Sequence, residues 1–143
     1  MSTVSTGDDL NAWLALEHEA VWLYPVIGAP FDGLRARANQ SFEAHRDTRD
    51  ALLARLDRLG VEPVSTALSY RTHALKNVAS ARRAARDIES RISAACLQVA
   101  GRSDADTRTF AVKSSRRPPS PTWPGERVPK PSPVCPDRRP TSP

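Results

Sequence analysis

The apolar positions between residues 31 and 59 predict one long amphipathic helix. They recur at steps of three and four residues, the spacing that places side chains on one face of a helix. These positions are Phe31, Leu34, Ala38, Phe42, Leu52, Leu56 and Leu59. Gly60 follows directly and predicts the end of the helix. His45 and Arg49 stand in the middle of the same face, so we expect this face to bury polar groups or to lead into a site.

A second helical pattern runs from about Asp9 to Ile27, with Thr6 as the expected N-cap. Glu17 is the one acidic residue on its apolar face. Pro25 falls inside the last turn, where a proline removes a hydrogen bond and kinks a helix. The apolar positions of this face are Leu10, Trp13 or Leu14, Val21, Tyr24 and Ile27.

The short connection at residues 28–30 forces the first two helices to lie antiparallel. Counting outward from Ala29 places Glu17 opposite about Ser41. His45 lies about one helical turn further along, at a rise of roughly 6 Å. The side chains of Glu17 and His45 could therefore meet.

Residues 61–77 show neither the helical nor the strand period, and they predict a long connection. At about 3.3 Å per residue this segment could span about 55 Å, more than the roughly 43 Å of the helix before it. The connection could therefore return the chain to the starting end of the bundle. The second and third helices would then run parallel.

The third helix is expected from about Ala79 to Ala100, capped by Asn77 or Ser80 and ended by Gly101. Its apolar face carries neither an acid nor a histidine. The positions of that face are Val78, Ala81, Ala85, Ile88, Ile92, Ala95 and Val99. We expect the charged residues of its other faces to be solvated. They are Arg82, Arg83, Arg86, Glu89 and Arg91.

A fourth helix is predicted to begin at residues 103–106, where Ser-Asp-Ala-Asp resembles a capping box. Only about a dozen residues follow before the composition changes near Ser115, so this helix is too short to cover the other three fully. Ten of the thirteen prolines lie after Arg116, where alanine and leucine are absent. We therefore divide the chain into a helical domain over residues 1–115 and a tail over residues 116–143.

The Pro- and Arg-rich tail is expected to be disordered. A frameshift near codon 113 of a GC-rich gene would explain both its composition and the early end of the fourth helix. Six Lys or Arg residues against two acids give the tail +4 of the formal net charge of +5. A fold that tracks phosphates carries its positive charge on the folded domain, so this distribution argues against nucleic-acid binding. Salt-sensitive attachment to nucleic acid through the tail is the alternative.

The cysteines and the N-terminus indicate the compartment. Cys96 and Cys135 form neither a disulfide framework nor a metal-ligand spacing, which suits a reducing environment. The N-terminus is polar and lacks the apolar run of a signal peptide, and no apolar stretch reaches membrane-spanning length. We expect a cytoplasmic protein without a membrane partner.

Three segments carry a family resemblance through their order and spacing. They are Glu17–Tyr24 followed by Gly28, Phe42–Arg46 with Arg49–Leu52, and Ala79–Arg83. Together they resemble an uncharacterised ferritin-like domain family of high-GC bacteria, a domain of unknown function, over about residues 9–112. The resemblance implies an all-α, ferritin-like four-helix bundle without a settled activity. Three features depart from the family: Pro25 replaces a small residue, the fourth helix is truncated instead of continuing as an Ala- and Leu-rich segment, and the tail has no counterpart.

The polar residues of the first two helices raise the question of a metal centre. A di-iron carboxylate site takes a glutamate from each of two helices and a Glu-x-x-His pair from each of the other two. Glu17 and His45 are candidate metal ligands, but Phe42 stands where the glutamate before His45 should be. The third helix offers no inward acid, His73 lies in the connection, and His18 is off the apolar face. We expect no cofactor, and iron or another divalent metal in a degenerate site is the alternative.

The structural interpretation is that Glu17, Tyr24, His45 and Arg49 form a buried hydrogen-bonded cluster, because each such group left unpaired would cost several kcal/mol. The sequence contains no nucleophile–base arrangement, glycine-rich phosphate loop or paired general acid and base, so we expect no enzyme. A short fourth helix predicts action by self-association, as a homo-oligomer, or by binding a protein partner. The side chains expected to lack cover include Leu14, Leu52, Ile88 and Ile92.

Overall fold

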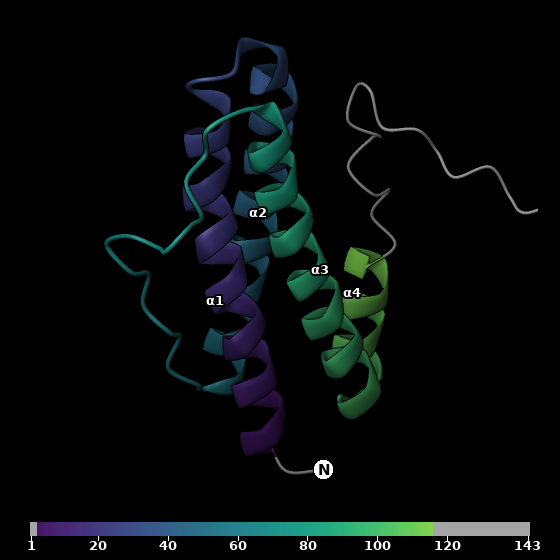
Figure 1. The fold of residues 1–143 in the computed structure, drawn as a ribbon. Helices are drawn as coiled ribbons and strands as arrows, with labels where there is room; N and C mark the ends of the chain where they lie inside the picture. The colour runs from purple at the N-terminus through teal and green to yellow at the C-terminus, as the bar shows by residue number, and fades with distance from the viewer. Residues whose placement is uncertain (1–2, 116–143) are drawn as a thin grey trace, which may run out of the picture.

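The computed structural model describes residues 3–115, which form four helices and no strand (Figure 1). The helices are α1 (Thr3–Gly28), α2 (Asp32–Leu59), α3 (Val78–Arg102) and α4 (Ala105–Ser115). Helix α1 packs against both α2 and α3, and α4 packs against α3. The predicted all-α fold class is confirmed. The tail over residues 116–143 and its predicted origin in a frameshift lie outside the described residues.

Helices α1 and α2 form the predicted antiparallel hairpin (Figure 1). Helix α1 begins at Thr3, so Thr6 lies inside the helix and the prediction that it is the N-cap is wrong. The helix continues through Pro25 to Gly28. A Cβ atom at Gly28 would lie 3.0 Å from the Cβ atom of Ala38, so glycine allows the end of α1 to approach α2 closely.

Gly60 ends α2 as predicted. It lies in the left-handed region with a φ of 65°, and its N–H donates to the carbonyl of Asp57 at 3.0 Å. Gly101, in contrast, does not end α3. That helix continues to Arg102, and the extended residue Ser103 caps it by donating its N–H to Val99. Among the described glycines, Gly60 alone turns into the left-handed region, where glycine is favoured as a helix C-cap.

The segment between α2 and α3 returns along the outside of α1, so that α2 and α3 run parallel (Figure 1). The side chain of Asn11 holds its first part, donating to the carbonyl of Glu62 and accepting from the amide of Val64. Further along the connection, the ring of Tyr70 packs against that of Trp22, with the ring centroids 5.7 Å apart. Asn77 and Ser80 then form a capping box that begins α3.

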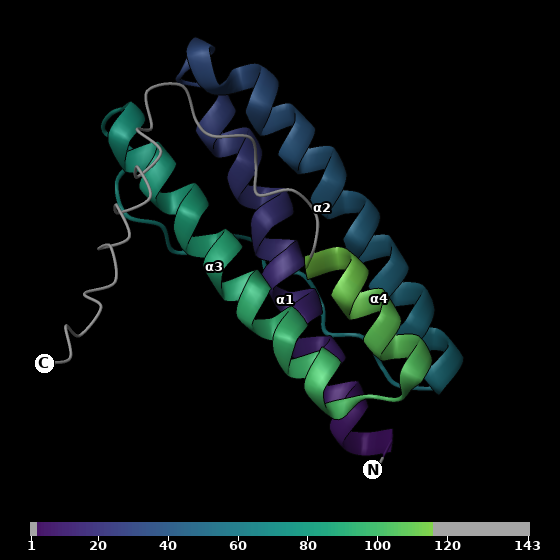
Figure 2. The ribbon, with the colours of Figure 1, turned by 90° about the vertical axis from the view of Figure 1, so that its right-hand side faces the viewer.

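Helix α4 has only 11 residues and lies beside part of the length of α2 and α3 (Figure 2). The Phe110 ring packs 5.2 Å from the ring of Trp13, and the guanidinium of Arg55 lies 4.3 Å from the Phe110 centroid. Arg55 also pairs with Asp106 at 2.7 Å. These contacts join α4 to α1 and α2.

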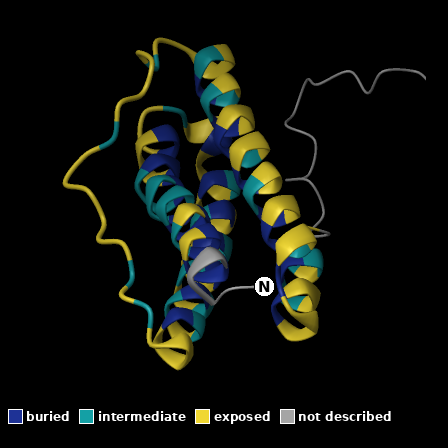
Figure 3. Ribbon diagram, turned by 90° about the horizontal axis from the view of Figure 1, so that it is seen from below, coloured by how far each residue is buried: buried dark blue, intermediate teal, exposed yellow. Residues whose placement is uncertain are grey.

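The buried residues face the interior of the bundle (Figure 3). Ala20 and Leu23 join the predicted face of α1, because this helix contacts two neighbours and buries two faces. The prediction that four side chains lack cover is wrong, because all four pack into a single core and are at most 7% exposed. They are Leu14, Leu52, Ile88 and Ile92. None of the helices within residues 3–115 combines the length and apolar character that crossing a bilayer requires.

Candidate functional site: a buried polar cluster

Glu17 is a carboxylate inside the apolar core, with 1% of its surface exposed. Trp13, one turn earlier on α1, donates its indole N–H to Glu17 Oε1 at 2.7 Å. The second oxygen, Oε2, lies 2.7 Å from Nδ1 of His45 on α2. The predicted meeting of Glu17 and His45 is confirmed, and both oxygens of this buried carboxylate have partners.

His45 bridges two carboxylates. Its Nδ1 faces Glu17, and its Nε2 lies 3.0 Å from Oε1 of Glu89 on α3. Burial opposes the charge of the ring, but the hydrogen bonds to Glu17 and Glu89 outweigh it and raise the pKa of His45 to about 9. At neutral pH the ring is therefore an imidazolium that donates both of its N–H groups.

Tyr24 closes the cluster from α1. Its ring stacks on the imidazole of His45, with centroids 5.3 Å apart and 10° between the planes. The phenol O–H donates to Oε1 of Glu89 at 2.5 Å. The cluster thus joins three helices through Trp13, Glu17, Tyr24, His45 and Glu89.

Glu89 belongs to the cluster, contrary to the prediction that it lies on a solvated face of α3. The side chain is 35% exposed, and its carboxylate contacts Tyr24 and His45. A signal was present, because Glu89 lies four residues after Ala85 and three before Ile92, and so borders the predicted apolar face. Cys96 borders the same face and is buried.

Arg49 does not join the cluster, contrary to prediction. It follows His45 by one turn, but its guanidinium pairs with the neighbouring Asp50 at 2.7 Å, where both side chains are partly exposed. A long arginine side chain can reach solvent from a half-buried position, which keeps its charge hydrated. The remaining histidines are also outside: His18 Nε2 lies 3.3 Å from the carbonyl of Val64, and His73 belongs to the connection.

The cluster does not fit the di-iron pattern. Glu17 and Glu89 contact opposite nitrogens of one imidazole ring, so their oxygens do not converge on a shared point. Burial raises the pKa of Cys96 to about 12, which keeps this thiol protonated. Across residues 3–115, no group of three or more His, Cys, Asp or Glu side chains is arranged to hold a metal ion.

The comparisons with known proteins agree with the fold. A family model described as "Domain of unknown function (DUF4439)" matches residues 9–117. Among solved structures, the chain is similar to the crystal structure of a conserved hypothetical protein, rv2844, from Mycobacterium tuberculosis. The TM-score is 0.76 with 24% sequence identity, over 80% of this chain and 89% of that one. At this identity the likeness shows the fold alone. No curated protein matches the chain.

Proposed function

The chain belongs to the DUF4439 family, and from this premise we propose that it is a ferritin-like helical bundle that acts by binding rather than by catalysis. The topology supports the ferritin-like assignment. A long connection between the parallel helices α2 and α3 is the one-crossover arrangement of ferritin-like bundles.

The non-catalytic proposal rests on the hydrogen bonding of His45, because both of its ring nitrogens already have partners. Both of its ring nitrogens face carboxylates, and a protonated imidazole cannot accept a proton from a substrate. Both oxygens of Glu17 also have partners, because Oε1 accepts from Trp13 and Oε2 contacts His45. The cluster therefore acts as an internal tie between three helices, and we assign the function to the surface of the bundle.

The short α4 favours self-association, or a protein partner, as the mode of binding. Helix α4 has 11 residues, whereas α3 has 25 and α2 has 28. Beyond its end, α2 and α3 continue along α1 (Figure 2). A helix from a second copy or from another protein would lie there in line with α4.

Sedimentation velocity on the full chain over a hundredfold range of concentration tests this proposal. We expect a mass above that of the 15.7 kDa chain that rises with concentration. A chain that stays monomeric throughout would reject self-association and leave a protein partner as the remaining form of the proposal. Affinity capture with the full chain would then test for that partner, and a specific partner should bind in proportion to the immobilised protein.

The alternative function is metal binding at a degenerate site, which is favoured by one observation. Acidic and imidazole side chains from three helices meet in one place, as they do in metal-binding bundles. Elemental analysis of protein purified without chelators distinguishes the two functions. If the protein holds about one metal ion per chain, and both Glu17→Ala and His45→Ala lose it, the result would favour metal binding over the structural proposal.

A further inference from the structure

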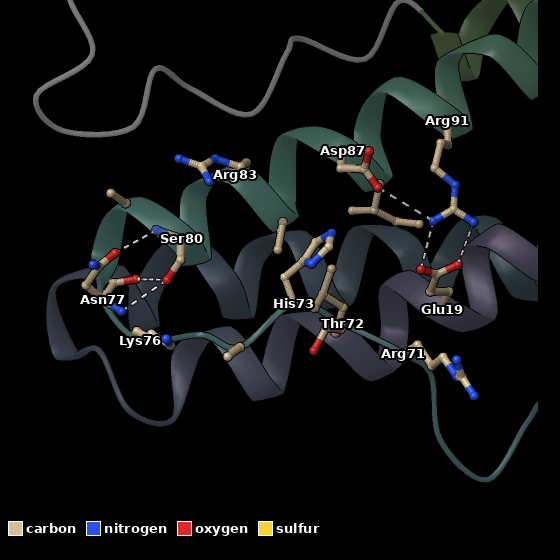
Figure 4. A pocket seen from close by; sticks show the side chains of 15 residues that line it. Glu19, Arg71, Thr72, His73, Lys76, Asn77, Ser80, Arg83, Asp87 and Arg91 are labelled. Carbon is tan, nitrogen blue, oxygen red and sulfur yellow. Dashed lines mark hydrogen bonds and ion pairs between the residues drawn. The ribbon is translucent and has the colours of Figure 1, made fainter.

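A cavity of about 880 Å³ lies between α1, the connection over residues 61–77 and the N-terminal half of α3 (Figure 4). Its volume falls in the range of small-molecule sites. None of the side chains of the polar cluster lines it. The cavity is therefore a separate feature of the bundle, and the long connection forms one of its walls.

The cavity walls carry an excess of positive charge. Arg71, Lys76, Arg83 and Arg91 line it, against only two acidic side chains. Through their side chains, Arg71, Lys76 and Arg83 make no hydrogen bond or ion pair with any residue of the described range 3–115. Their charges are therefore available to an anion.

Arg91 and Glu19 close one end of the cavity. The guanidinium of Arg91 forms a two-pronged ion pair with Glu19, at 2.8 and 2.9 Å, and lies 3.8 Å from Asp87 (Figure 4). This pairing neutralises Glu19, so Arg71, Lys76 and Arg83 face one remaining acid, Asp87. Lys76 and Arg83 lie toward the opposite end, where α3 begins, and the ring of His73 lies between the two ends in this view.

The basic side chains, and not the start of α3, supply the binding groups at this end. The side chain of Asn77 already accepts from the amide of Ser80, so the first turn of α3 is capped. Leu23 and Ile88 lie almost fully buried behind the wall, so the apolar surface of the cavity comes from Ala74, Ala79 and Ala84. A ligand with both a charged and an apolar portion matches this division.

We propose that this cavity binds a small phosphorylated molecule, with its phosphate group held by Lys76 and Arg83 and its body packed against Ala79 and Ala84. Arginine binds phosphate oxygens through parallel N–H donors, and lysine adds a compact charge. The volume accommodates a molecule of nucleotide size. This ligand goes beyond the proposed function and does not require self-association.

Isothermal titration of the full chain at an ionic strength of about 0.1 M tests the site, with ADP, pyrophosphate and adenosine as probes. We expect saturable binding of ADP at one site per chain. The double variant Lys76→Gln with Arg83→Gln should weaken it at least about tenfold, since two charge-assisted contacts are lost. The matched control Arg35→Gln with Arg46→Gln removes two arginines of α2 that do not line the cavity, and it should bind ADP as the natural chain does.

The probes also distinguish the sources of the phosphate. Tighter binding of ADP than of pyrophosphate supports the proposal and identifies an organic phosphate, whereas equal binding would overturn the contact between the ligand body and the apolar wall. Binding of adenosine as tight as that of ADP, equal losses in the two double variants, or no saturable binding of either phosphate would each overturn the proposal. Circular dichroism checks that each variant is folded. The sedimentation mass, measured in parallel, separates failure of this site from failure of self-association.

Discussion

Glu17 of α1 and His45 of α2 face each other across an antiparallel hairpin, with Oε2 2.7 Å from Nδ1. Both side chains are buried in the core. A buried charge without its partner is strongly destabilising, because the protein interior solvates it poorly. The pair therefore ties the two helices together in one register, and four predictions follow from its surroundings.

The pair should show energetic coupling in a double-mutant cycle. Glu17→Gln or His45→Gln alone should lower the free energy of unfolding by about 2–4 kcal/mol, because each leaves its partner poorly paired in the core. The double variant should cost less than the sum of the two. Urea unfolding followed by circular dichroism measures all four corners of the cycle. Arg46→Ala, at an exposed ion pair with Glu43, should change stability by less than about 0.5 kcal/mol, and strict additivity within the cycle would show that the buried pair does not interact.

Stability should fall as the pH rises from neutrality to above 9. The folded pKa of His45 is raised from 6.5 to about 9, so the stabilisation is fully present below pH 6.5 and is lost as the pH rises through 9. The free energy of unfolding should fall by on the order of 3 kcal/mol. The groups that face the ring are Glu17 and Tyr24 of α1 and Glu89 of α3.

Urea unfolding at a series of pH values between 6 and 10 measures this dependence. His45→Gln should remove most of the slope, because glutamine does not titrate. A natural chain whose stability is flat or rises with pH over this range would show that His45 is not held as an imidazolium.

Glu89→Gln should weaken the cluster less than Glu17→Gln does. Glu89 is 35% exposed and Glu17 is buried, so water screens the charge at Glu89 more effectively. The substitution should also lower the pKa of His45, since it removes one of the two carboxylates. Titration of the His45 resonances by NMR detects the change. Asp87→Asn, two residues away on α3, serves as the matched control and should leave this pKa unchanged.

The thiol of Cys96 should be inert in the folded chain. Burial, followed by the charge of Glu17, raises its pKa to about 12, so almost no thiolate is present at pH 8. A Cys135→Ser variant isolates this thiol for labelling with a chromogenic disulfide reagent. We expect labelling only at the rate of unfolding and complete labelling in denaturant. Rapid reaction in native buffer would mean that α3 is not packed as described.

The sequence by itself determined the helices and the meeting of Glu17 with His45. Helical periodicity and Gly60 are local signals. A connection of three residues allows the first two helices only an antiparallel arrangement. The facing positions on that hairpin then follow from counting residues. These features depend on neighbours along the chain, which explains why a sequence pattern could predict them.

The sequence also predicted Tyr24 in the cluster, whereas the tertiary structure decided the contact of Glu89, the exclusion of Arg49 and the cavity. The contact of Glu89 with His45 depends on how α3 is rotated against α1 and α2, and that rotation is set by packing between residues far apart in the chain. Arg49 lies outside the cluster because its long side chain reaches Asp50, nearer to solvent. The connection became a cavity wall only because it returns along α1 to the start of α3. Periodicity describes one helix at a time, whereas the contact of Glu89 and the cavity wall depend on residues far apart in the chain.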